Sequence, residues 1–347
     1  MTDAESRPVS LAAVGRSTLI LTGGAVIVQM IGFARQLFLA AEVGITSGLD
    51  ALLIAMAAPL ALVGVLTAGV QTAIVPAYAE AKDERGPKDA KRLVGTVLVW
   101  TAIGGMVVSL ALWVAADPII AITGPGLSET GTADDAVRYL RALAPLGFLL
   151  AVSSIFYALC QAESLFPAIA VAQVAAPLLA LAFMIAYWDA MALDGLVLGT
   201  LVGAIVSLSV VIVATVIRRV APSPRLMVRG LGLKSLLRHA APLTASAAIL
   251  QVNLIFDRAV ASWLAAGGVS LLRYGESLVR LPFAAISPAW GQAVYPALVR
   301  ANRAPGETDL AEMTERMLRY ALVFFVPLAA LTLAVAPVAV AVAYDRG

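Results

Sequence analysis

The chain has 347 residues, of which 61% are apolar and only 13% charged, and its formal net charge is +2. Its mean hydropathy of +0.92 lies far above that of ordinary soluble domains, which excludes a soluble globular protein and indicates an integral membrane protein. The single cysteine, Cys160, excludes an internal disulfide, and the lone His239 makes a histidine-rich metal site implausible. We expect no metal and no other cofactor.

Apolar runs of membrane-spanning length recur along the whole chain. Prolines inside these runs fit helices, because membrane helices tolerate proline as a kink; they are Pro59, Pro76, Pro145, Pro177 and Pro282. The sequence therefore predicts an all-α integral membrane protein, a polytopic helical bundle with nine spans. The expected spans lie near residues 17–43, 50–79, 93–116, 136–160, 164–187, 194–217, 239–264, 270–299 and 319–342.

The basic residues are distributed unevenly between the expected loops. With a cytoplasmic N-terminus, the inner segments contain most of the 24 lysines and arginines, including those of stretches 82–92 and 218–239. The outer loops then contain none, near 44–49, 117–135, 188–193 and 265–269. Because lysine and arginine accumulate in short cytoplasmic loops, we expect a multi-pass protein with its N-terminus in the cytoplasm.

Two stretches on either side of the basic linker 218–239 resemble each other. "ARQLFLAAEVGITSGLDALLIAMAAP" (34–59) aligns without gaps on "DRAVASWLAAGGVSLLRYGESLVRLP" (257–282), although two apolar hairpins can also match by chance. Both copies would run outward, which indicates a parallel repeat about an axis along the membrane normal. We expect an N-terminal six-helix lobe over residues 1–220. Residues 221–347 would form the first three helices of a second lobe, incomplete in this chain.

The first expected helix carries polar residues in the middle of its apolar run. Gln29, Gly32, Arg35 and Gln36 lie within roughly 120° of one another on a helical wheel. An arginine at this depth is costly if it faces lipid, so this arc is expected to face protein or a hydrated cavity.

The seventh and eighth expected helices carry similar stripes. Thr244, Gln251 and Arg258 recur every seven residues, and Asn253 and Asp257 form a neighbouring stripe. In the eighth helix the charged face comprises Arg273, Glu276, Ser277 and Arg280. Surplus positive charge facing a cavity suits a pyrophosphate, because guanidinium groups bind phosphate oxygens in pairs. The candidate substrate-binding residues are Arg35, Arg280, Arg258, Arg273, Gln29 and Gln251.

Some of these charges have a structural alternative. Glu276 and Arg280 have the i, i+4 spacing of an ion pair, Asp257 and Arg258 could pair across helices, and Asp50 could cap the second helix. Prolines at equivalent repeat positions are expected to bend the second and eighth helices beside the cavity. We assign structural or coupling roles to Asp50, Asp257, Glu276, Pro59 and Pro282.

Four stretches carry a more specific resemblance: "GFARQ", "SGLDALLIAMAAP", "TAGVQTAIVPAYAEAK" and "VNLIFDRAVASWLAAGGVSLLRYGESLVRLPFAAISPAWGQAVYPAL". They are similar to signatures of the MurJ/MviN family, lipid II flippases of the multidrug, oligosaccharidyl-lipid and polysaccharide exporter superfamily. The similarity extends from about residue 15 to the end. Members have two six-helix lobes and two further helices, and this chain matches the first nine.

The resemblance implies a transporter, not an enzyme, in the bacterial plasma membrane. Its substrate would be an undecaprenyl-pyrophosphate-linked peptidoglycan precursor, lipid II, moved to the outer leaflet by alternating access. Membrane lipids and proteins of cell-wall synthesis are candidate partners, and no nucleic acid is expected. The chain departs from the family pattern where charged residues are replaced, at Gln29, Val63, Ala68 and Ser277. Arg280, one turn beyond Ser277, could replace the arginine missing there.

Other functions remain open at this point. A divergent member could move another lipid-linked oligosaccharide or be an inactive structural or regulatory pseudo-transporter. A cation-coupled drug antiporter of the same superfamily would use Asp257 as its proton or sodium site. A glycosyltransferase would need outer carboxylates, for which the candidates are Asp117, Glu129, Asp134 and Asp135. An ATP-driven pump is disfavoured, because "RGLGLKS" (229–235) lacks the spacing of a phosphate-binding loop.

Overall fold

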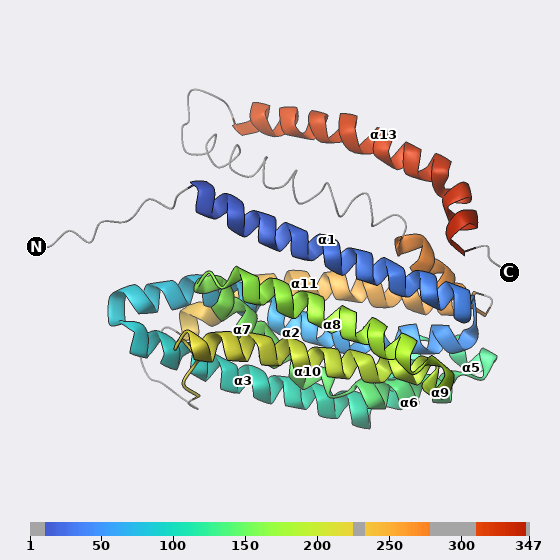
Figure 1. Ribbon diagram of the computed structural model, residues 1–347, viewed down its shortest axis with the longest axis horizontal. Helices are drawn as coiled ribbons and strands as arrows, with labels where there is room; N and C mark the ends of the chain where they lie inside the picture. The colour runs from blue at the N-terminus through green and yellow to red at the C-terminus, as the bar shows by residue number, and fades with distance from the viewer. Residues whose placement is uncertain (1–10, 225–232, 265, 278–309, 345–347) are drawn as a thin grey trace, which may run out of the picture. The chain divides into compact units, whose positions relative to one another are not determined.

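The computed structural model describes residues 11–224, 233–264, 266–277 and 310–344 (Figure 1). All regular secondary structure in these ranges is helical, which confirms the predicted fold class. Within the described residues, 7 helices are long and apolar enough to cross a membrane, and a bent pair makes an eighth span. These match eight of the nine predicted spans. The remaining one, 270–299, lies mostly outside the described residues.

The helices exceed the predicted spans at several ends because helix-forming polar residues continue them. In chain order they are α1 (Leu11–Glu42), α2 (Ser47–Arg85), α3 (Pro87–Val114), α4 (Ala116–Thr123), α5 (Leu127–Thr130), α6 (Ala133–Leu143), α7 (Leu146–Ala162), α8 (Phe166–Ala186), α9 (Trp188–Met191), α10 (Leu193–Ile217), α11 (Leu233–Ser262) and α13 (Leu310–Tyr344). Residues 268–277 are also helical.

The prolines act differently in different spans. The predicted span 136–160 is broken into α6 and α7, which meet at an angle of 41°. Pro145 immediately precedes α7, where its missing N–H and fixed φ favour a helix start. In contrast, α2 continues as one helix through Pro59 and Pro76. The bends expected beside Pro59 and Pro282 stay predictions, and Pro282 lies outside the described residues.

The chain forms two compact units, and each is described by itself. The larger comprises Met1–Gly32 and Ile45–Ser270, and the smaller comprises Phe33–Gly44 and Leu271–Gly347. The predicted lobe boundary at residues 220/221 remains a prediction. In the larger unit α2 is the central helix, packed against α3, α7 and α11, while α8 packs along α10.

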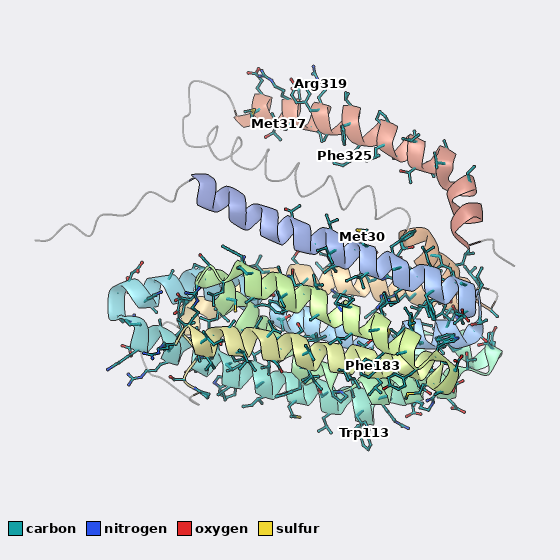
Figure 2. All side chains as sticks on the ribbon, in the orientation of Figure 1. Met30, Trp113, Phe183, Met317, Arg319 and Phe325 are labelled. Atoms are coloured by element: carbon teal, nitrogen blue, oxygen red, sulfur yellow. The ribbon has the colours of Figure 1, made fainter. Side chains whose placement is uncertain are left out.

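Outward-facing positions of the spans carry large apolar side chains. Met30 on α1 and Trp113 on α3 are 65% and 57% exposed, and Phe325 belongs to α13 (Figure 2). Such surfaces suit contact with hydrocarbon rather than water. Charged residues of α13 lie in its first turns, where Glu312 pairs with Arg316 and Glu315 with Arg319.

Glycines allow α11 to approach α2 closely within the larger unit. A Cβ atom on Gly69 would overlap the carbonyl oxygen of Ala240 and the hydroxyl of Thr244. Further along, a Cβ atom on Gly64 would lie 3.0 Å from Nε2 of Gln251. The stripe predicted from Thr244 and Gln251 therefore faces α2.

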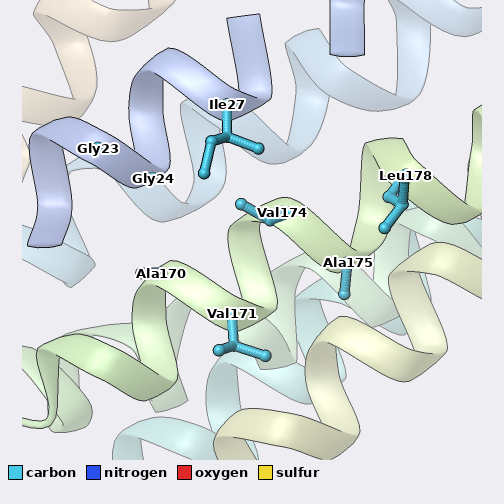
Figure 3. Close-up of a pocket in the computed structure, with 8 residues that line it drawn as sticks. All are labelled: Gly23, Gly24, Ile27, Ala170, Val171, Val174, Ala175 and Leu178. Atoms are coloured by element: carbon cyan, nitrogen blue, oxygen red, sulfur yellow. The ribbon is translucent and has the colours of Figure 1, made fainter. Parts of the chain in front are cut away.

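An apolar groove of about 520 Å³ lies between α1 and α8 (Figure 3). Gly23 and Gly24 leave the space on α1, and small or branched residues of α8 form the opposite wall. A Cβ atom on Gly24 would lie only 3.3 Å from that of Ala170, so the two helices nearly touch there.

Candidate functional site

The polar arc predicted on α1 is partly buried in the structure. Gln29 and Arg35 are half-buried, and Gln36 is only 4% exposed. Arg35 forms no ion pair with any carboxylate in the described part of the chain. Instead, the structure brings it close enough to Arg273 for the two guanidinium charges to repel each other, within the smaller unit. Two cations in one partly buried region favour an anion between or beside them.

Arg273 is itself partly neutralised by a neighbour on its helix. Its guanidinium forms an ion pair of 3.2 Å with Glu276, three residues further on. Glu276 was expected to pair with Arg280, which lies outside the described residues, so that pairing stays untested. Of the predicted substrate-binding residues, Arg35 and Arg273 are thus a pair whose charges act on each other within the described residues.

Gln36 adds an unusual feature beside Arg35. Its buried side-chain oxygen has no hydrogen-bond donor among the described residues. A buried acceptor without a partner costs about 1–3 kcal/mol, so such groups usually face a ligand, a water molecule or another part of the protein. The helical wheel placed Gln36 on the polar arc, but nothing in the sequence distinguished it from Gln29.

Asp50 has the opposite surroundings, because its buried carboxylate is fully engaged. The side chain is 4% exposed and accepts hydrogen bonds from the N–H of Gly267 at 2.8 Å and the N–H of Ser270 at 2.7 Å. The hydroxyl of Ser270 donates a third bond of 2.5 Å. Asp50 thereby satisfies the free N–H groups at the start of the helix 268–277 and places a negative charge at its positive end.

This finding corrects the expectation that Asp50 caps its own helix. The N-cap of α2 is Thr46, whose hydroxyl accepts a bond of 3.3 Å from the N–H of Leu49. Asp50 lies one turn further on and caps a helix more than 200 residues away in sequence. Sequence reasoning missed this partner because a capping pattern shows only local neighbours.

The turns of the two aligned hairpins share a backbone feature. Gly44 and Gly267, which occupy equivalent positions in the repeat alignment, have φ angles of +65° and +90°. Glycine adopts this region without a steric penalty, because it has no Cβ atom. Both hairpins therefore turn at a glycine with a positive φ angle. The match supports the internal repeat, which was proposed on side chains alone.

The predicted residues of α11 have mixed surroundings. Gln251 is half-buried against α2, as described above, and Arg258 is half-buried as well. Asp257 is exposed and accepts a long hydrogen bond of 3.4 Å from the side-chain amide of Asn253. The pairing of Asp257 with Arg258 stays a prediction.

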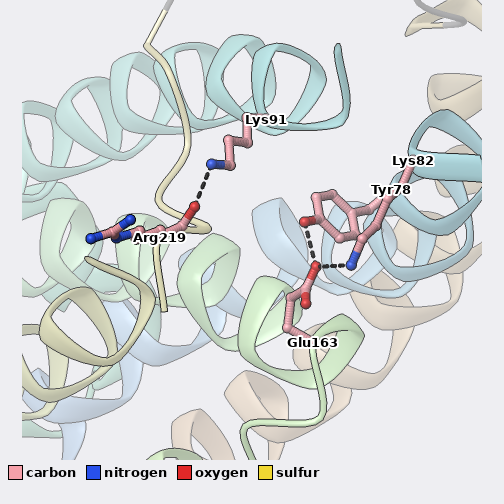
Figure 4. A network of polar contacts seen from close by, with 5 residues as sticks. All are labelled: Tyr78, Lys82, Lys91, Glu163 and Arg219. Atoms are coloured by element: carbon pink, nitrogen blue, oxygen red, sulfur yellow. Dashed lines mark hydrogen bonds and ion pairs between the residues drawn. The ribbon is translucent and has the colours of Figure 1, made fainter. Parts of the chain in front are cut away.

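A separate polar cluster joins α2, α3, α7 and the segment after α10 (Figure 4). One carboxylate oxygen of Glu163 accepts a bond of 2.5 Å from the Tyr78 hydroxyl and forms a 2.6 Å ion pair with Lys82. Burial alone would raise the pKa of Glu163. Hydrogen bonds from Lys82 and Tyr78, with the positive charges of Lys82 and Lys91, outweigh it and hold this pKa below its usual value.

Lys91 of the same cluster also binds the segment that follows α10 to α3. Lys91 donates to the carbonyl oxygen of Arg219, and the N–H of Ser223 donates to the carbonyl oxygen of Lys91 at 3.1 Å. A Cβ atom on Gly95 would overlap the backbone of Ser223, so this segment lies directly on α3. Glu163 could not be identified from the sequence, because an isolated carboxylate after a helix has no distinguishing pattern.

Two of the four acidic residues considered for glycosyl transfer form ion pairs at the surface. Asp117 pairs with Arg141 at 2.7 Å, and Asp135 pairs with Arg138 at 3.8 Å. Arg138 also pairs with Asp194 at 2.7 Å. Exposed ion pairs of this kind are ordinary solvated surface charges.

Comparisons with known proteins agree with this fold. Residues 39–347 match the family model described as "Lipid II flippase MurJ". A lipid II flippase MurJ of Burkholderia cenocepacia is 26% identical over 298 residues, covering 83% of this chain and 57% of that protein. A probable lipid II flippase MurJ of Rhizobium meliloti is 26% identical over 336 residues, covering 92% and 61%. The chain thus spans about three fifths of the length of these curated relatives.

Solved structures show the same architecture. A lipid II flippase MurJ in an inward closed conformation superposes with a TM-score of 0.78 at 18% identity, covering 95% of this chain and 68% of that one. An inward-facing multidrug resistance MATE family transporter of the MOP superfamily gives a TM-score of 0.71 at 17% identity, with 95% and 74% covered.

Proposed function

The chain belongs to the lipid II flippase MurJ family, and from this membership we propose that it is part of a transporter of lipid-linked peptidoglycan precursor. The transporter would move undecaprenyl-pyrophosphate-linked lipid II from the inner to the outer leaflet of the bacterial plasma membrane by alternating access. The observation that carries the proposal is the family match over residues 39–347. It outweighs the drug-antiporter alternative, for which the likeness to a MATE transporter supports the fold alone.

Arg35 and Arg273 are the proposed contacts for the diphosphate of this substrate. Arg35 is half-buried, lacks a described carboxylate partner and is repelled by Arg273. A diphosphate would relieve that repulsion and accept paired hydrogen bonds from guanidinium groups. Arg280, Arg258, Gln29 and Gln251 remain further candidates, of which Arg280 lies outside the described residues.

The orientation follows from the distribution of basic residues. With the N-terminus in the cytoplasm, the start of α2 and the turn at Gly267 lie at the outer side, and the Glu163 cluster lies at the inner side. In that orientation the hydrogen bonds from Gly267 and Ser270 to Asp50 would hold the outer side closed. Alternating access would require these bonds to break when the outer side opens.

Lipid translocation by the full-length gene product in proteoliposomes tests the proposal. Fluorescent lipid II placed in one leaflet should become accessible to an impermeant quencher on the other side faster than in protein-free vesicles. Normally inserted protein that gives no acceleration would contradict the flippase function. An acceleration of drug efflux that depends on a cation gradient and on Asp257 would favour the antiporter instead.

A further inference from the structure

The loop between α4 and α5 contacts the end of α11, and the residues of this contact do not belong to the predicted site. The N–H of Gly126 donates a hydrogen bond of 3.1 Å to the hydroxyl oxygen of Ser262. That hydroxyl in turn donates to the carbonyl oxygen of Ala259 at 2.7 Å, so both of its hydrogen-bonding roles are used. Gly126 is buried, and Ser262 is only 7% exposed.

The glycine at position 126 is required by space, not by backbone conformation. Its φ angle of −70° is one that any residue adopts. A Cβ atom there would overlap the carbonyl group of Ser262 and lie 3.0 Å from the N–H nitrogen of Trp263. These are backbone atoms, so a side chain at position 126 would push the end of α11 away from the loop.

The other side of the same loop is fixed to α2. A Cβ atom on Gly124 would lie 2.7 Å from Cδ1 of Ile54, a side chain that is fully buried. Leu127 is 2% exposed at the start of α5. The loop therefore connects the end of α11 to the start of α2 through packing that does not involve Asp50.

We propose that the Gly126–Ser262 contact helps to hold the outer side closed, in addition to the hydrogen bonds of Asp50. We call this contact the second clasp. It holds the end of α11 against the α4–α5 loop in the closed state and separates when the outer side opens. Asp50 secures the following helix at Gly267 and Ser270, whereas Gly126 secures α11 itself. This inference rests on the proposed transport function and its orientation.

The test measures exposure of a buried position at the end of α11. Every native cysteine of the full-length protein, which within these 347 residues is Cys160 alone, is changed to serine, and Ala261, which is 4% exposed, is changed to cysteine as a reporter. A membrane-impermeant maleimide is added from the outer side to full-length protein in spheroplasts. We expect Gly126→Ala and Ser262→Ala each to raise the labelling rate roughly five- to tenfold, because each removes or displaces a buried hydrogen bond.

Matched controls come from the same region. Gly48→Ala adds a methyl group where no described atom lies within 4 Å, and Ser128→Ala removes an exposed hydroxyl that bonds to Pro125 in the same loop. Both should label at the parent rate. Residue 126 contacts Ser262, beside the reporter, and Gly126→Ala adds a methyl group there, whereas Ser262→Ala removes an oxygen atom. Faster labelling in both variants therefore points to the lost contact and not to added bulk.

The second clasp would be overturned if Gly126→Ala and Ser262→Ala both insert normally and label at the parent rate. Faster labelling of Asp50→Asn in the same experiment shows that the reporter detects opening of the outer side. If Gly126→Ala does not insert, Ser262→Ala decides alone. The labelling assay contains no lipid-linked substrate, so its outcome is separate from the flippase test. Faster labelling without lipid translocation would support the clasp and count against the transport function.

Discussion

Asp50 and Arg35 are both charged residues in membrane spans, yet their surroundings differ completely. The carboxylate of Asp50 is buried and accepts three hydrogen bonds. Arg35 has no described carboxylate partner, is repelled by Arg273 and lies next to the unsatisfied oxygen of Gln36. A charge whose bonds are complete stabilises the protein, whereas a charge left without a partner can be stabilised by a ligand.

The largest expected effect is on transport, at Arg35. Arg35→Glu should reduce lipid translocation by at least about a hundredfold, because it replaces a phosphate-binding cation by an anion that repels the substrate. Lysine should restore part of the activity, since it keeps the charge and loses the paired donors. Translocation in proteoliposomes is the measurement. The control is Arg319→Glu, whose parent side chain is 71% exposed and pairs with Glu315 on its own helix. Equal losses in both variants would contradict a specific role for Arg35.

The second effect concerns the stability of the protein and tests the role of Asp50. Asp50→Ala should lower the free energy of unfolding by about 2–4 kcal/mol, because the N–H groups of Gly267 and Ser270 lose a charged acceptor. Thermal unfolding in detergent measures it. Asp117→Asn is the control, since that exposed carboxylate forms a surface ion pair and should change stability by less than about 1 kcal/mol. A parent-like melting temperature for Asp50→Ala would show that the outer hydrogen bonds contribute little.

A third prediction compares two packing sites that carry no charge. Gly69→Ala should destabilise the protein by about 1–3 kcal/mol, because its methyl group would overlap the backbone of Ala240. Gly64→Ala should cost clearly less, since the nearest atom is the flexible end of Gln251. The ratio of folded to unfolded protein in a thermal scan distinguishes them. Equal losses would mean that α11 does not approach α2 more tightly at Gly69.

The smallest expected effect is pH-dependent and lies at the Glu163 cluster. The pKa of Glu163 is lower in the folded protein than in the unfolded chain. Ionised Glu163 therefore stabilises the fold fully above the ordinary carboxyl pKa of about 4.3, and this contribution is lost as the pH falls through the lower folded pKa. Glu163→Gln should therefore be less stable than the parent by about 1 kcal/mol near neutral pH. The difference should shrink under acid conditions. A difference that stays constant or grows with acidification would contradict the assignment.

The membrane-spanning helices were predictable because each depends on a local property, a long apolar run. The fourth span was expected to continue through Pro145 with a kink, whereas the structure divides it into two helices that meet at 41°. Helix ends were less predictable, since α2 continues to Arg85 through polar residues that also favour helix.

The candidate site was predictable only in part, for a physical reason. Periodicity identified the polar arc of Arg35 and Gln36, because residues on one helix face repeat with its pitch. It could not show that Asp50 meets Gly267, that Gly126 meets Ser262, or that Glu163 meets Tyr78, since these contacts join distant parts of the chain. The repeat alignment did relate two distant turns, because it pairs Gly44 with Gly267, and both adopt positive φ angles.

Ligand-induced stabilisation tests the central claim most directly. The melting temperatures of the full-length parent, Arg35→Gln and Asp50→Asn are measured with and without purified lipid II in excess. A ligand at about a hundred times its dissociation constant stabilises a protein by roughly 2.7 kcal/mol. The account predicts that lipid II raises the melting temperature of the parent and of the less stable Asp50→Asn by similar amounts, but hardly that of Arg35→Gln. An equal rise in Arg35→Gln would contradict it, because Arg35 would then have no part in holding the diphosphate.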